Sequence, residues 1–187
     1  MTKEEIRKKY KAKRKKLSDE DIEHLSLSIA NQLLKLSIWD YISYHLFLSI
    51  IKHKEVNTEY ILNILSGKDK NIIIPKSNFN TNTLTHYLLT DNTKIKTNSW
   101  GIPEPIDGIK VEYSKIDVVF VPLLAFDLKG YRVGYGKGFY DNFLKNCNTK
   151  TLKIGLSFFG AEDQIKDIYD GDISLDYCIT PSLVYKF

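Results

Sequence analysis

Apolar and polar residues along this chain fall into blocks that predict strands and helices in alternation. Short, strongly apolar blocks predict core strands over residues 41–47, 71–75, 117–122, 152–158 and 177–180, with a more exposed strand over 84–90. Apolar residues at helical spacing predict helices that begin after Thr2, Ser18, Thr58 and Gly138. Alternation of this kind is typical of an α/β fold around a largely parallel sheet.

The expected helix ends carry recognisable signals. Thr2 and Glu5 have the spacing of a capping box. Ser18 precedes three acidic residues, which favour the positive end of a helix dipole, and this second helix should run to about residue 37. Thr58 is expected to cap the third helix and Gly67 to end it.

Three segments follow neither pattern. Residues 92–98 are polar and predict a loop or an edge strand, and residues 167–176 predict an acidic loop. Residues 100–105 hold two prolines, which exclude a helix and predict a rigid, extended segment. Trp100, at the start of that segment, either lines a pocket or covers the core, and both interpretations stay open.

Length and composition predict one compact domain that spans residues 1–187. The chain is 43% hydrophobic and 27% charged, as in an ordinary globular protein, and no apolar run is long enough to span a bilayer. The first residues lack the apolar stretch of a secretory signal, so we expect a cytoplasmic protein. We also expect a monomer. Cys147 and Cys178 are too few for a disulfide framework, and the four histidines show no metal-ligand spacing.

The main candidate for chemistry is the glycine-rich stretch over residues 126–141, which should follow a buried strand and open a helix. Gly134, Gly136 and Gly138 alternate, so the backbone can adopt positive φ and bring its amides close to an anion. Arg132 and Lys137 add mobile positive charge. Asp141 would repel a phosphate unless a cation such as Mg²⁺ lay between them, which indicates a Mg²⁺-nucleotide site. The alternative is a tight turn without a ligand, because the stretch matches neither the P-loop nor the Rossmann spacing.

The net charge of +4 is unevenly placed, because nine lysines and arginines crowd the first helix between residues 3 and 16. This helix could bind nucleic acid, or some of its cations could reach the phosphates of a nucleotide. A solvated face is the commonest outcome for such a run. We rank nucleic acid last, because no RNA-binding signature with interleaved aromatic residues follows the helix.

Together these features resemble the 5-formyltetrahydrofolate cyclo-ligase family, also called methenyltetrahydrofolate synthetase, over nearly the whole chain. The most specific part is the stretch from Phe126 and Asp127 through the glycine loop to Asp141. The other matching parts are Lys3, Arg7, residues 47–49, Glu55, Thr58, residues 99–105, Pro122, residues 172–176, Thr180 and Pro181.

The resemblance implies a compact fold with Rossmann-like topology and an ATP- and Mg²⁺-dependent closure of 5-formyltetrahydrofolate to 5,10-methenyltetrahydrofolate. Arg132 and Lys137 would supply the catalytic positive charge. The ATP-binding residues implied are Lys3, Arg7, Arg132, Val133, Gly134, Tyr135, Gly136, Lys137, Gly138, Phe139 and Tyr140. The folate-binding residues implied are Leu48, Glu55, Tyr135, Gly136, Lys137, Gly138 and Phe139.

Asp141 and Asp172 would hold the metal, although Asp170 and Asp176 lie in the same acidic loop and compete with Asp172 for that role. The small-molecule partners implied are the folate and ATP, with neither nucleic acid nor a membrane. The alternative activity is that of another small-molecule kinase or ATPase that uses the same glycine-rich loop.

Overall fold

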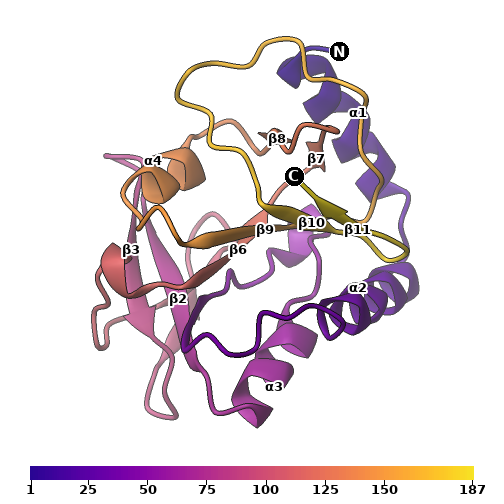
Figure 1. Cartoon of the computed structure of the whole chain (residues 1–187). Coiled ribbons are helices and arrows are strands. Elements are labelled where there is room, and N and C mark those ends of the chain that lie inside the picture. The colour runs from indigo at the N-terminus through magenta and orange to yellow at the C-terminus, as the bar shows by residue number, and fades with distance from the viewer.

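A seven-stranded sheet forms the centre of the molecule, with its strands in the order β11-β10-β9-β6-β1-β2-β3 (Figure 1). The computed structural model describes all of residues 1–187. Strands β10, β9, β6, β1 and β2 run parallel, and the edge strands β3 and β11 run antiparallel to their neighbours. The seven strands are β1 (Ser43–His45), β2 (Asn71–Asn78), β3 (Thr83–Leu88), β6 (Val118–Pro122), β9 (Leu152–Leu156), β10 (Tyr177–Ile179) and β11 (Val184–Lys186).

Both faces of the sheet are covered, which explains why its strands are apolar almost throughout. On β6, Val118 and Phe120 pack in the cluster that contains α2 (Asp19–Leu33) and α3 (Glu59–Gly67). Val119 and Val121 point to the other face, where they pack with α4 (Phe139–Lys145). The α/β fold with a mostly parallel sheet, predicted from the alternation of the blocks, is confirmed.

The first two helices begin as predicted. Thr2 and Glu5 form a capping box at the start of α1 (Lys3–Lys15), and Ser18 and Asp21 form a second one at the start of α2. The predicted end of α2 near residue 37 is wrong, because the helix ends at Leu33.

The predicted bounds of α3 are confirmed, because Thr58 directly precedes the helix and Gly67 is its last residue, but the Thr58 side chain does not form the expected cap. The Thr58 hydroxyl donates to the Phe47 carbonyl at 2.8 Å, and Asn57 Oδ1 accepts from the Glu59 amide instead. Gly67 is the last helical residue, and Asp69, two residues further on, adopts the left-handed conformation.

Two small hairpins and two 3-10 turns complete the fold. β4 (Ile95–Thr97) pairs with β5 (Pro103–Pro105), which confirms an edge strand and an extended proline segment. β7 (Ala125–Phe126) pairs with β8 (Arg132–Val133), between β6 and the glycine loop. We had expected the glycine loop to follow the buried strand directly. That expectation is wrong, because the β7–β8 hairpin lies between β6 and the loop. The 3-10 turns are η1 (Ile51–His53) and η2 (Tyr113–Lys115).

Helix α1 packs against the β7–β8 hairpin rather than the main sheet (Figure 1). Ile6 and Tyr10 are buried there against Leu124, Ala125 and Val133. This packing places the basic helix beside the glycine-rich loop. No helix has both the length and the apolar character that a bilayer span requires.

Candidate active site

A cavity of about 730 Å³ lies beyond the carboxyl ends of the parallel strands β1, β2 and β6. Phe47 and Leu48 reach it after β1, Pro75 and Ser77 from β2, and Pro122 from the end of β6. Ligands of open α/β sheets bind at this edge, and the volume lies in the usual range for ligand pockets. The segment after β1 opens onto the same edge as the glycine loop, since both line the cavity.

The glycine loop presents open backbone amides to this cavity. Residues 134–138 lie between β8 and α4, and none of their amides donates a hydrogen bond within the protein. Gly136 and Gly138 adopt the expected positive φ, at 95° and 72°. Gly134 does not, so the expectation is wrong for that residue. Five amides without acceptors along one cavity wall are the donors that an anion cradle requires.

The two cations of the loop differ in their surroundings. Lys137 is exposed, lines the cavity and forms no ion pair. Arg132 is buried, and its guanidinium donates to the Ile173 carbonyl and, at 2.7 Å, to Asp141. Burial lowers the pKa of Arg132, and the nearby carboxylate of Asp141 opposes this shift. The expectation that Arg132 is mobile is therefore wrong, although the residue does line the cavity.

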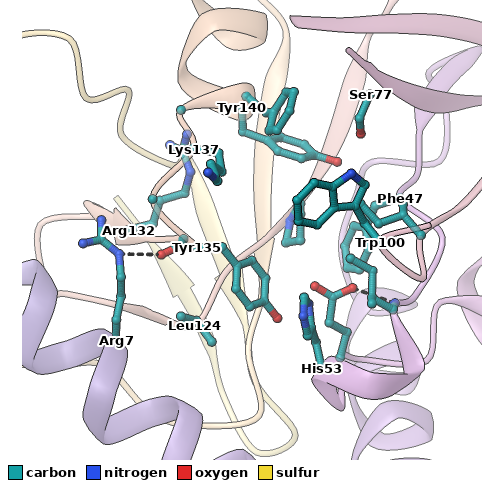
Figure 2. Close-up of a pocket in the computed structure, with 18 of the residues that line it drawn as sticks. Arg7, Phe47, His53, Ser77, Trp100, Leu124, Arg132, Tyr135, Lys137 and Tyr140 are labelled. Atoms are coloured by element: carbon teal, nitrogen blue, oxygen red, sulfur yellow. Dashed lines mark hydrogen bonds between the residues drawn. The ribbon is translucent and has the colours of Figure 1, made fainter. Parts of the chain in front are cut away.

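Helix α1 turns a stripe of cations toward the cavity. Each of its cavity-lining residues lies three or four positions from another, which is the spacing of one helix face, and they are Lys3, Arg7, Lys11, Arg14 and Lys15. Arg7 Nε donates to the Gly134 carbonyl at 3.0 Å, so this arginine is anchored on the glycine loop (Figure 2). The basic residues on this face of α1 can therefore contact a small molecule bound in the cavity.

Asp141 and Asp172 line the same cavity, and each already faces a cation. Asp141 Oδ1 accepts from Arg132, and Asp172 Oδ2 accepts from Lys3. The second oxygen of each carboxylate forms no hydrogen bond within the protein. The structure contains no group of three or more acidic, histidine or cysteine side chains that could hold a metal alone. One or two carboxylates completed by phosphate oxygens and water are what Mg²⁺ commonly uses, so the residues fit that ion.

Glu55 belongs to the opposite wall of the cavity and is only 5% exposed. Its Oε2 accepts from the Ile50 amide at 2.8 Å. The segment that carries it is closed by Ser49, whose hydroxyl donates to the Val56 carbonyl at 2.6 Å and accepts from the Thr58 amide at 3.0 Å. Burial raises the pKa of Glu55, while the hydrogen bond from Ile50 lowers it. A buried, fixed carboxylate of this kind can accept hydrogen bonds from a ligand.

Aromatic side chains extend this wall and point into the cavity (Figure 2). Trp100 stacks on Phe79 with ring centroids 5.1 Å apart, and His53 lies over Tyr135 at 4.8 Å. Trp100 therefore lines a pocket and remains 56% exposed, which excludes the alternative that it covers the core.

Sequence reasoning assigned no role to Phe79, His53 or Arg14, because none of them lies in a motif. Arg14 alone had a signal, since it shares the helix face of Lys3 and Arg7 at the spacing of an amphipathic stripe.

The model of a family described as the 5-formyltetrahydrofolate cyclo-ligase family matches residues 1–168. The chain belongs to the 5-formyltetrahydrofolate cyclo-ligase family. A probable 5-formyltetrahydrofolate cyclo-ligase from Schizosaccharomyces pombe is 29% identical over 189 residues, which covers 91% of each chain.

Solved structures agree with this membership. The NMR structure of 5,10-methenyltetrahydrofolate synthetase from Aquifex aeolicus is 32% identical, has a TM-score of 0.84, and covers 100% of this chain and 93% of its own. A structure of 5,10-methenyltetrahydrofolate synthetase from Mycoplasma pneumoniae is 24% identical, with a TM-score of 0.77 and coverage of 97% and 99%. The second likeness bears on the fold alone. The family resemblance expected from the glycine-rich stretch is thus confirmed.

Proposed function

We propose that this protein is a 5-formyltetrahydrofolate cyclo-ligase, which uses ATP and Mg²⁺ to convert 5-formyltetrahydrofolate to 5,10-methenyltetrahydrofolate, ADP and phosphate. Membership of the family supports this activity. The observation that carries it is the division of one cavity into two chemically different walls. Open amides and cations line one wall, and a buried carboxylate among aromatic rings lines the other.

The first wall suits the triphosphate of ATP. The amides of residues 134–138 would donate to phosphate oxygens, and Lys137 would add a charge that no protein group neutralises. Lys3 and Arg7 face the same space from α1. Val133, Phe139 and Tyr140 frame the loop on either side. Arg132 would act mainly by fixing Asp141, while its charge remains beside the phosphates.

The second wall suits the folate. A pterin presents amino and ring N–H donors on one edge, and Glu55 offers a carboxylate whose Oε2 is already oriented by the Ile50 amide. Leu48 and Trp100 add apolar surface against which a flat ring can lie. Residues 135–139 all line the cavity, and Tyr135 contacts His53 of the second wall, so we infer that they would contact both ligands.

The reaction needs no protein nucleophile. The γ-phosphoryl group of ATP leaves ADP and bonds to the formyl oxygen, which makes the formyl carbon a strong electrophile. The neighbouring folate nitrogen attacks that carbon and loses its proton, the ring closes, and the carbon–oxygen bond breaks to release phosphate. Lys137 and the loop amides would neutralise charge during the phosphoryl transfer, where one such contact can lower the barrier by about 3 kcal/mol.

Asp141 and Asp172 are the residues that would hold Mg²⁺. When bound, the ion would supply charge neutralisation between these carboxylates and the phosphate oxygens. Asp172 is a better candidate than Asp170 or Asp176, because Asp172 alone of the three lines the cavity.

The deciding experiment mixes the protein with 5-formyltetrahydrofolate and follows the near-ultraviolet absorbance of the methenyl product, with and without Mg·ATP. We expect a rise that depends on both ATP and Mg²⁺. No rise with both present would exclude the cyclo-ligase, and ADP release without folate would point to a different ATPase. A cytoplasmic location and a monomeric state remain predictions from the sequence.

A further inference from the structure

Three exposed lysines line one end of the cavity without any counter-charge. Lys11 and Lys15 belong to α1 and Lys52 to η1, and we call them the rim lysines. None of them forms an ion pair within the protein. The three carboxylates that line the cavity already accept from other groups, namely from the Ile50 amide, Arg132 and Lys3. The rim lysines are therefore free to bind an anionic ligand.

Lys11 lies beside the aromatic wall of the cavity. Its Nζ is 5.9 Å from the centroid of the Tyr135 ring, and His53 lies over the same ring at 4.8 Å (Figure 2). The Tyr135 hydroxyl accepts from Arg14 at 2.8 Å, so this ring is held from α1. Arg14 is only 4% exposed and also donates to the Leu123 carbonyl. The accessible cation next to this aromatic surface is therefore Lys11 and not Arg14.

Lys15 and Lys52 lie where α1 meets the segment after β1. Lys54 Nζ, from that segment, donates to the Lys15 carbonyl at 3.3 Å. The Lys52 side chain reaches the β4–β5 hairpin, since a Cβ added to Gly101 would lie 3.0 Å from Lys52 Cε. Gly101 directly follows Trp100, which also lines the cavity. The rim lysines thus surround the outer end of the wall to which Glu55 and the aromatic rings belong.

Part of this rim is remote from the glycine loop. Arg7 marks the loop on α1, because its Nε donates to the Gly134 carbonyl. An α-helix rises about 1.5 Å per residue, so Lys15 lies about 12 Å from Arg7 along the helix axis. Lys52 comes from η1, on the far side of the contact with α1. The positive charge at this end favours an anion other than the triphosphate held by the loop amides.

We propose that the rim lysines bind the two glutamyl carboxylates of the folate and so make the site selective for a substrate with an anionic tail. This inference rests on the proposed function. 5-Formyltetrahydrofolate carries a pterin, an aminobenzoyl ring and a glutamyl group, in that order. With the pterin at the buried Glu55 and the aminobenzoyl ring against Trp100 and Tyr135, the glutamyl group would lie at the exposed end of that wall, among the rim lysines.

The test compares 5-formyltetrahydrofolate with its bis-amide, in which both glutamyl carboxylates are neutral amides of nearly the same size. In the unchanged protein, kcat/KM should be at least about tenfold lower for the bis-amide, because each exposed ion pair contributes a factor of about two to five. A triple variant of the rim lysines should lower kcat/KM for 5-formyltetrahydrofolate by the same factor. It should change kcat/KM for the bis-amide and KM for ATP by less than about twofold. This rim variant combines Lys11→Met, Lys15→Met and Lys52→Met.

The matched control loses the same net charge at three exposed lysines that do not line the cavity. It should discriminate between the two folates as the unchanged protein does. Equal losses in the rim variant and the control would assign the effect to net charge, and an equal loss for both folates would assign it to the fold. A change confined to KM for ATP would place the rim lysines at the phosphates. Each of these results would overturn the proposal. The control combines Lys8→Met, Lys16→Met and Lys129→Met.

Binding provides a measurement that needs no turnover. Isothermal titration calorimetry with Mg·ADP present, which cannot phosphorylate the folate, should show that the rim variant binds 5-formyltetrahydrofolate about tenfold more weakly than the control. Equal affinities in the two variants, with methenyl product still formed by the unchanged protein, would overturn this inference and leave the proposed function intact. Rim-dependent binding without any methenyl product would do the reverse.

Discussion

At the scale of single residues, the two cations of the glycine loop show how position decides role. Arg132 belongs to β8, and its side chain is buried between the Ile173 carbonyl and Asp141. Lys137 lies between Gly136 and Gly138, which both adopt positive φ, and its side chain is exposed. The sequence gives both residues the same formal charge. Only the structure separates a cation that orients a carboxylate from one available to a ligand.

Substitution of Lys137 should therefore remove binding energy without damaging the fold. We expect Lys137→Met to lower kcat/KM for ATP by about 10²-fold or more, as for one lost electrostatic contact in a transition state. The melting temperature should stay within about 2 °C, because exposed, unpaired residues contribute little to stability. Steady-state kinetics and a thermal melt measure the two effects.

The matched control is Lys129→Met, an exposed lysine of the β7–β8 turn that does not line the cavity. Its kinetics should equal those of the unchanged protein. Similar losses in both lysine variants would mean that net charge, and not the position of Lys137, governs activity.

At the scale of elements, the predictable parts are those with a period or a cap. The core strands and helices α1 and α2 were found because apolar spacing and capping boxes are local signals. The β7–β8 hairpin has two residues in each strand, too short for a period, so neither it nor the docking of α1 on it was predicted. The prediction that the Thr58 hydroxyl caps α3 is wrong because this hydroxyl bonds the carbonyl of Phe47 instead. That acceptor lies eleven residues away, so the local sequence does not reveal it.

The contact between α1 and the glycine loop can be tested through Gly136. Its φ of 95° is strained for any residue with a Cβ, and an added Cβ would lie 3.3 Å from the guanidinium carbon of Arg7. Gly136→Ala should cost about 1–3 kcal/mol of strain or displace the loop amides together with Arg7. We expect KM for ATP to rise by about tenfold, measured by steady-state kinetics, as such a displacement would produce.

Gly67→Ala provides the comparison, because Gly67 ends α3 without positive φ and with no atom near an added Cβ. It should leave KM for ATP unchanged and slightly stabilise the protein. If Gly136→Ala bound ATP as well as Gly67→Ala, the close approach of Arg7 would have no part in the site.

At the scale of the whole molecule, the cavity is assembled from segments that lie far apart in the chain. Residues near 3–15, 47–55, 75–84, 100–103, 122–141 and 169–172 all reach it. The parallel sheet predicts that loops after β1 and β6 meet at one edge, which is a consequence of topology. The placement of Trp100 on Phe79 and of Arg14 on Tyr135 depends on side-chain packing that no periodic pattern records.

The same packing leaves two histidines buried and without hydrogen-bond partners. His45 on β1 and His86 on β3 lie under α4, with ring centroids 5.1 Å apart, and both rings contact Phe143. Burial lowers the pKa of His86 to about 4 and that of His45 well below its usual value. Both therefore stay neutral in the folded protein at a pH where the unfolded chain binds protons.

The stability of the whole protein should then fall in mild acid. Well above pH 6.5 neither state binds protons at these sites, so the histidines add no pH dependence there. Below pH 6.5 the unfolded state binds protons at these histidines and the folded state does not. Each histidine therefore lowers the free energy of unfolding by about 1.4 kcal/mol for each pH unit of acidification. For His86 this loss continues until the pH reaches about 4.

Urea unfolding at several pH values between 7.5 and 5 measures this slope. His86→Phe keeps an aromatic ring beside Phe143 but cannot bind a proton, so it should make the slope shallower by the contribution of one histidine. His24→Asn, at an exposed position of α2, should leave the slope unchanged. Carboxylates elsewhere contribute equally to the pH dependence of both variants. If the free energy of unfolding fell with pH equally steeply in His86→Phe and His24→Asn, the acid sensitivity would come from those carboxylates and not from the buried histidines.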